Sequence, residues 1–192
     1  LVPGLPRRSG DVLVAWTDEA RRRLTMDGHA VTPAEVHLRS YLGEIDGTHY
    51  VTACTTPAES RVGCIDSGGF RWLSEPGKYT TATVESDLII TSETTWDRYG
   101  AQVTVRDRDY AVLADVDSLA EVPQVEASPT LLAAGIEDVQ VVVLMPSEQS
   151  SEPLPILMNP YGGPHAQRVL AARSAYAGAQ WLADQGFCVV IA

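Results

Sequence analysis

Long apolar runs are missing from this sequence of 192 residues. The longest are Val141–Met145 and Phe187–Ala192, and both are far shorter than the roughly 20 residues that a membrane-spanning helix needs. The N-terminal residues LVPGLPRR also lack the basic-then-apolar order of a secretory signal. We therefore expect no membrane association and a cytoplasmic protein, with secretion as the alternative if the N-terminus is itself a cut end.

Basic residues are also few. The sequence has 14 Lys and Arg residues against 25 Asp and Glu residues, which gives a formal net charge of −11. Nucleic acids and anionic membrane surfaces bind clustered positive charge, so this balance argues against both as partners. The hydrophobic fraction of 45% and the charged fraction of 20% are those of a globular protein, and the chain is long enough to bury a core.

Cysteine and histidine form no metal or redox motif. The three cysteines, Cys54, Cys64 and Cys188, include no C-x-x-C pair, which argues against a disulfide framework and a zinc knuckle. We expect buried free thiols; the alternative is a disulfide between Cys54 and Cys64, which lie on neighbouring predicted strands. The histidines have no metal-ligand spacing, and there is no glycine-rich phosphate loop. The sequence therefore predicts no metal and no cofactor.

A helical period is absent from residue 11 to about residue 117, where short strands alternate with turn residues such as Asp46-Gly47. The segments predicted as strands are Asp11–Thr17, Glu35–Leu42, His49–Thr55, Arg61–Asp66, Asp87–Ser92, Ala101–Arg106 and Tyr110–Asp115. Regularly spaced short strands indicate a sandwich, a barrel or the blades of a β-propeller, and a recurring strand-turn-strand cadence favours blades. Trp16, Trp72 and Trp96 lie in this half and are predicted to pack in blade cores.

The pattern changes near Leu119–Val125. Four further strands are predicted, the last two as buried strands, at Pro129–Ala133, Asp138–Met145, Leu154–Asn159 and Phe187–Ile191. A helix is predicted over Arg168–Gln185, because its apolar residues recur three or four positions apart and Gly186 follows as a C-terminal cap. A strand, a helix and a strand in this order are typical of a parallel sheet. We therefore predict an all-β domain at residues 1–118 and the opening of an α/β domain at residues 119–192.

One connection in the second domain combines the features of a ligand-binding loop. It lies within Pro155–Arg168, after a strand whose carboxyl end is where open α/β sheets bind ligands. Gly162 and Gly163 permit positive φ or close approach, Pro164 stiffens the turn, and Tyr161 can present a phenol donor. The alternative is an ordinary strand-to-helix loop whose tyrosine packs on the rim.

This connection resembles the start of the catalytic domain in the prolyl oligopeptidase family of serine peptidases, above all its dipeptidyl peptidase IV-like branch. The matching stretches are Pro155–Gln167, Trp181–Gly186 and Phe187–Ala192. The acylaminoacyl-peptidase branch usually has His at the position of Tyr161, which favours the dipeptidyl peptidase side. The resemblance implies that residues 1–118 are the C-terminal part of a β-propeller and residues 119–192 the N-terminal part of an α/β-hydrolase domain.

The resemblance also implies a function. Enzymes of this branch release N-terminal dipeptides of the Xaa-Pro type through a Ser-His-Asp triad and an acyl-enzyme. By the same resemblance Tyr161 is an oxyanion-hole donor, Gly162, Gly163 and Pro164 shape its loop, and the partners are a peptide substrate and, in the full-length enzyme, a second copy. No G-x-S-x-G elbow is present, so the chain is expected to be an inactive fragment. The alternatives are an acylaminoacyl peptidase or oligopeptidase of the same family, and a non-catalytic β-rich binding module.

Overall fold

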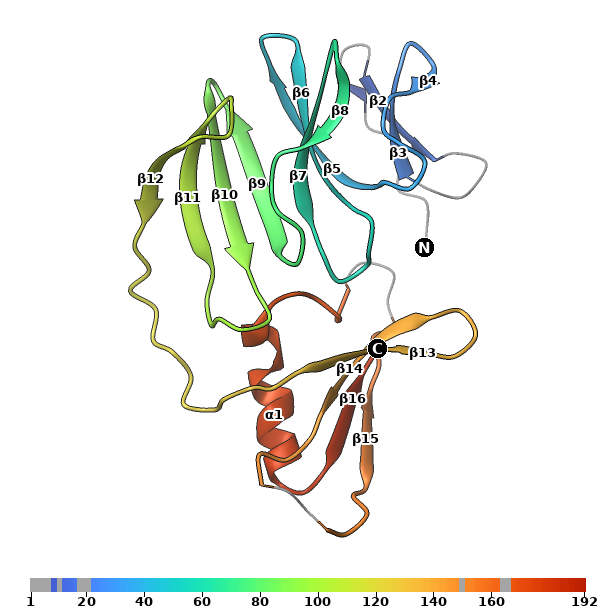
Figure 1. Ribbon diagram of the computed structural model, residues 1–192, viewed down its shortest axis with the longest axis vertical. Helices are drawn as coiled ribbons and strands as arrows, with labels where there is room; N and C mark the ends of the chain where they lie inside the picture. The colour runs from blue at the N-terminus through green and yellow to red at the C-terminus, as the bar shows by residue number, and fades with distance from the viewer. Residues whose placement is uncertain (1–7, 10–11, 17–21, 149–150, 163–166) are drawn as a thin grey trace. The chain divides into compact units, whose positions relative to one another are not determined.

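Strands in four four-stranded sheets make up most of the regular secondary structure in this computed structural model, which describes residues 8–9, 12–16, 22–148, 151–162 and 167–192 (Figure 1). The chain forms two units. The first consists of Leu1–Glu93 and Gln102–Ser118, and the second of Thr94–Ala101 and Leu119–Ala192. The chain therefore contributes to the second unit twice, first through a short loop and then through its C-terminal part.

Three of the sheets lie in the first unit, and each is made of four strands that follow one another along the chain. The first sheet contains β1 (Arg8–Ser9), β2 (Val12–Trp16), β3 (Arg22–Met26) and β4 (His29–Ala30). The second contains β5 (His37–Ile45), β6 (Thr48–Cys54), β7 (Arg61–Asp66) and β8 (Gly69–Trp72), and the third contains β9 (Tyr79–Glu85), β10 (Leu88–Thr94), β11 (Gln102–Asp107) and β12 (Val112–Val116). Consecutive four-stranded sheets are consistent with the blades of a propeller.

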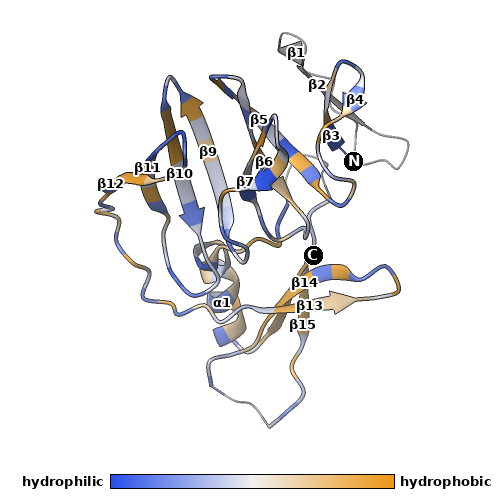
Figure 2. Cartoon of the chain, turned by 45° about the horizontal axis from the view of Figure 1, so that its top comes forward, coloured by the Kyte–Doolittle hydropathy of each residue, from blue (hydrophilic) through white to orange (hydrophobic). Residues whose placement is uncertain are grey.

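The second sheet buries apolar residues on both of its faces. One apolar cluster joins it to the first sheet and contains Leu24, Val36, Leu38, Val51, Ala53 and Ile65. Another joins it to the third sheet and contains Ile45, Tyr50, Cys64 and Ile89. Because successive residues of a strand face opposite sides, Tyr50 and Val51 of β6 enter different clusters. Strand β12 is the opposite case, because its residues Val112, Leu113 and Val116 are all exposed. Figure 2 shows the hydrophobic colour of this strand.

Local turn chemistry behaves as the sequence predicts. Asp46 and Gly47 have φ values of 48° and 78° between β5 and β6, which is the geometry of a type I′ hairpin turn. Several strands were nevertheless not predicted, among them β3, β8 and β9. In β3 the reason is composition: Leu24 is its one buried residue, and two arginines and a threonine surround it. In β8 the strand is too short, at 4 residues, to show a period.

The second unit contains a mixed sheet with the order β13-β14-β16-β15. Its strands are β13 (Thr130–Ala134), β14 (Val139–Leu144), β15 (Ile156–Asn159) and β16 (Cys188–Ile191). β15 runs parallel to β16, with Ile156 opposite Cys188, and helix α1 (Ala177–Asp184) lies between them in the chain. β14 runs antiparallel to β16. The predicted strand-helix-strand unit with parallel strands is therefore confirmed, inside a sheet that also holds an antiparallel hairpin.

The prediction that the strand before the loop is buried is wrong. β15 is at an edge of its sheet among the described residues, and Ile156 and Met158 are 66% and 57% exposed. Its apolar composition suggested burial on both faces, but composition does not specify whether a strand has neighbours on one side or on two. β16, which has a partner on each side, does bury Val189 and Ile191.

The predicted helix over Arg168–Gln185 is also too long. Only a 3₁₀ turn at Arg173–Tyr176 and helix α1 form, and Gly186, with a φ of 98°, follows as the predicted C-terminal cap. Upstream of Arg173, tertiary partners take the backbone groups that a helix would use. The carbonyl of Leu170 accepts the Tyr176 hydroxyl, and the N–H of Arg173 donates to the carbonyl of Thr95.

Candidate functional site

Tyr161 lies at the carboxyl end of the parallel strand pair. Pro160 follows the last residue of β15 and has no N–H, so the ladder to β16 stops there. The next N–H, that of Tyr161, donates to the carbonyl of Ala192, just beyond the end of β16, at 3.3 Å. Strand β15 and its neighbour β16 thus hold the backbone of Tyr161 at the edge where parallel α/β sheets place their ligand sites.

Tyr161 is 39% exposed, so part of the residue is open to solvent. Gly162 is exposed as well, its φ lies outside the left-handed region, and a Cβ at this position would meet nothing within 4 Å. The geometry there does not require glycine, although it leaves open space beside Tyr161. The other two predicted loop residues, Gly163 and Pro164, lie outside the described residues.

Tyr176 fixes the backbone on the helix side of this connection. Its side chain is 0% exposed, and its hydroxyl accepts the N–H of Leu170 and donates to the carbonyl of the same residue, both at 2.8 Å. Burial raises the pKa of this phenol, and the hydrogen bond from Leu170 lowers it in part. Because burying an unpaired hydroxyl is costly, these two bonds specify where the ring can sit. The sequence pattern identified Tyr176 only as an apolar position of a helix.

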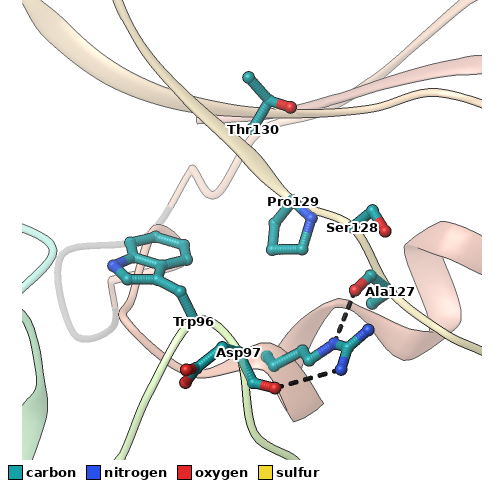
Figure 3. A pocket seen from close by; sticks show the side chains of 7 residues that line it. Trp96, Asp97, Ala127, Ser128, Pro129 and Thr130 are labelled. Carbon is teal, nitrogen blue, oxygen red and sulfur yellow. Dashed lines mark hydrogen bonds between the residues drawn. The ribbon is translucent and has the colours of Figure 1, made fainter.

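A hollow of about 350 Å³ lies elsewhere in the second unit, and the sequence did not predict it. Its lining residues are Trp96, Asp97, Ala127, Ser128, Pro129, Thr130 and Arg173 (Figure 3). The guanidinium of Arg173 donates to the carbonyl of Ala127 at 2.7 Å and to that of Asp97 at 3.2 Å. The Asp97 carboxylate accepts the Thr95 hydroxyl at 2.6 Å, which lowers its pKa. These charged groups therefore bind neighbouring parts of the chain.

The tryptophans divide between the two units. Trp72 packs against the apolar cluster between the first and second sheets, as predicted, with Phe70 edge-on at 4.8 Å and Arg61 above its ring. The prediction for Trp96 is wrong, because this residue belongs to the loop Thr94–Ala101 of the second unit and stacks on Tyr176. The side chain of Trp16 lies outside the described part of the structure.

Titratable residues do not gather into a metal site: within the described residues, no group of three or more His, Cys, Asp or Glu side chains could hold an ion. His49 is buried, and its Nδ1 lies 3.1 Å from the Tyr41 hydroxyl. All three cysteines are free, as expected; Cys54 and Cys64 are buried as predicted, whereas Cys188 is only half-buried. In the β6–β7 register Cys64 faces Tyr50, so Cys54 lies four residues, about 13 Å, further along the strand and out of disulfide range.

None of the described helices is long and apolar enough to cross a membrane.

The fold is similar to that of solved peptidase structures. No protein-family model matches the sequence, and no curated protein sequence is similar enough to match it. Solved structures do match. Dipeptidyl peptidase 4 from Porphyromonas gingivalis aligns with 97% of this chain at a TM-score of 0.78 and 18% identity. A puromycin-hydrolysing peptidase from Mycobacterium tuberculosis aligns with 97% of the chain at a TM-score of 0.68 and 19% identity.

The match covers only part of each relative. This chain spans 29% of the Porphyromonas structure and 32% of the mycobacterial one. The resemblance to the prolyl oligopeptidase family, and to its dipeptidyl peptidase IV-like branch, is thereby confirmed at the level of the fold.

Proposed function

We propose that this chain is part of a serine peptidase of the dipeptidyl peptidase IV-like branch. In this proposal residues 1–118 are the last blades of a β-propeller and residues 119–192 are the opening strands of an α/β-hydrolase domain. The observation that carries the proposal is the position of Tyr161, on the loop after β15 and tied to the carboxyl end of β16. The fold similarity to two peptidases supports it.

In the proposed reaction a serine hydroxyl adds to the carbonyl carbon of the scissile peptide bond, and the carbonyl oxygen becomes an oxyanion. The Tyr161 hydroxyl donates a hydrogen bond to that oxyanion, so the bond is strongest when charge develops. The triad histidine takes the proton of the serine hydroxyl as the hydroxyl adds, and gives it to the departing amine of the shortened peptide when the tetrahedral intermediate collapses and the C–N bond breaks. The acyl-enzyme that remains is hydrolysed by water, which releases the dipeptide and restores the serine. The serine, histidine and aspartate of this triad lie outside the 192 residues in the proposal.

Replacement of Tyr161 tests the role assigned to its hydroxyl. In the complete protein, Tyr161→Phe should lower kcat on an Xaa-Pro substrate by about 100-fold or more, because an oxyanion-hole donor acts mainly in the transition state. KM should stay within about two-fold, because the hydroxyl contributes little to ground-state binding. Steady-state kinetics with a chromogenic Xaa-Pro amide measure both values.

Tyr99→Phe is the matched control, because it removes a phenol hydroxyl that bonds to the backbone of Val125 and Ala127 in the same unit. Its kcat should remain close to that of the unsubstituted protein. A Tyr161→Phe protein with unchanged kcat would exclude the oxyanion role.

Substrate class separates the remaining alternatives. A free N-terminal amine should be required by a dipeptidyl peptidase, whereas an acylaminoacyl peptidase or oligopeptidase should also cleave blocked Xaa-Pro substrates. The mycobacterial relative is named for puromycin hydrolysis, so puromycin is a second substrate to assay.

A fluorophosphonate should label the complete protein and leave the isolated chain unlabelled. A complete protein that neither reacts with the probe nor cleaves any of these substrates would be the non-catalytic binding module.

A further inference from the structure

The loop Thr94–Ala101 connects β10 with β11, two strands of the first unit's third sheet, yet its residues belong to the second unit. We infer that this loop is an intramolecular docking segment that fixes where helix α1 starts and how the chain enters it. The inference goes beyond the proposed peptidase function and does not depend on it.

Two hydrogen bonds, one from a side chain and one between backbone groups, hold the first half of the loop. The Thr94 hydroxyl donates to the carbonyl of Ala171 at 3.0 Å, and the carbonyl of Thr95 accepts the N–H of Arg173 at 2.7 Å. These are the residues at which the predicted helix fails to form. In an uninterrupted helix the N–H of Arg173 would donate to the carbonyl four residues earlier, so the loop replaces an intrahelical bond with a tertiary one.

Aromatic and cationic side chains hold the second half of the loop. The Trp96 ring stacks on the Tyr176 ring with centroids 5.9 Å apart and planes 10° apart. The Arg173 guanidinium lies 4.8 Å from the centre of the Tyr99 ring, while it donates to the carbonyls of Asp97 and Ala127. The Tyr99 hydroxyl in turn bonds to the backbone of Val125 and Ala127. Arg173 thus binds the loop and the segment before β13 at once, which its planar fork of donors allows.

Tyr176 connects the docked loop with the site connection. One face of its ring contacts Trp96, and its hydroxyl holds Leu170. If Trp96 is removed, the Tyr176 ring loses its stacking partner and the hydroxyl is less well fixed. The N–H of Leu170, which donates to that hydroxyl, should then be less protected from exchange.

Amide hydrogen exchange in the intact chain tests this inference, because it reads each backbone bond separately. Trp96→Leu should speed exchange at the amides of Leu170 and Arg173 by about ten-fold or more. Trp72→Leu is the matched control, since Trp72 also pairs with an aromatic ring and an arginine, but in the first unit. It should speed exchange around β7 and β8 and leave Leu170 and Arg173 unchanged.

Arg173→Lys provides a second, conservative variant that keeps the charge and removes the fork. This variant should also speed exchange at the amide of residue 173, because a lysine ammonium cannot replace both carbonyl bonds and the contact with Tyr99. Unchanged exchange at both amides in Trp96→Leu, or equal acceleration by Trp72→Leu, would overturn the inference. If Trp96→Leu unfolds the whole chain, Arg173→Lys alone tests the inference: faster exchange at the amide of residue 173 supports it, and unchanged exchange overturns it.

Discussion

Glu93 is the one buried carboxylate among the described residues, at 6% exposure. It lies 2.8 Å from the ammonium of Lys78, the single lysine of the sequence, and 3.6 Å from the guanidinium of Arg106. Arg106 also donates to the carbonyl of Tyr110 and stacks over its ring. A buried group of opposite charges adds little net stability, because removing each charge from water costs about as much as the charges gain by attraction. Removing one member is nevertheless costly, because it leaves the others buried without a partner.

Neutralising Glu93 should therefore destabilise the first unit. Glu93→Gln keeps the size of the side chain but leaves the largely buried Arg106 guanidinium without its anion, and we expect a loss of about 3 kcal/mol in the free energy of unfolding. Urea denaturation measures it. The control is Asp46→Asn, which removes an exposed ion pair with Arg108 and should cost less than about 1 kcal/mol. Equal effects of both substitutions would contradict the prediction.

At the scale of the element, the β7–β8 hairpin shows why one strand residue must be glycine. Gly63 lies opposite Trp72, and a Cβ built on it would come within 2.8 Å of the Phe70 ring. Phe70 is itself fixed edge-on against Trp72, so the ring has little freedom to move aside. Close approach, and no special backbone angle, explains the glycine at this position.

Two glycine-to-alanine substitutions should accordingly change the free energy of unfolding in opposite directions. Gly63→Ala should destabilise the chain by about 1–3 kcal/mol, because the added methyl overpacks the hairpin. Gly178→Ala should stabilise it by up to about 1 kcal/mol, because Gly178 lies in helix α1 and a Cβ there meets nothing within 4 Å. Thermal or urea unfolding of the two single variants measures the difference. A stable Gly63→Ala variant would show that Phe70 can move.

At the scale of the whole molecule, the free thiols are distributed over both units. Cys54 and Cys64 are buried in the first unit, and Cys188 is half-buried in the second. Burial raises the pKa of both Cys54 and Cys64, so fewer of these thiols are ionised at a given pH. Because the thiolate is the reacting form, burial and a raised pKa both slow their modification.

In a titration with a thiol reagent at pH 8, the three cysteines should therefore react one after another. In the native chain Cys188 should react first, and Cys54 and Cys64 should react only as the first unit opens. In denaturant all three thiols should react, and reduction should leave the mass unchanged. Detection of a single thiol in the denatured, unreduced chain would instead demonstrate a disulfide between two of the three cysteines.

How far the sequence predicted the fold differs between its two halves. In the first, β-branched strands and Asp-Gly turns lie a few residues apart, so β5, β6 and β7 were found close to their observed bounds. In the second, the parallel pair of β15 and β16 and the cap at Gly186 were predicted correctly. For the site, motif resemblance singled out Tyr161; its role stays a prediction, and the structure adds its place beside Ala192.

The sequence by itself determined those features that depend on neighbours within a turn or a strand: the hairpin at Asp46-Gly47 and the alternation in the strands. The tertiary structure alone decided that Trp96 belongs to the second unit and that helix α1 starts only after Tyr176. The physical reason is sequence distance. The bonds responsible join Thr94 to Ala171 and Asp97 to Arg173, across 77 and 76 positions, and no local pattern encodes such a pairing.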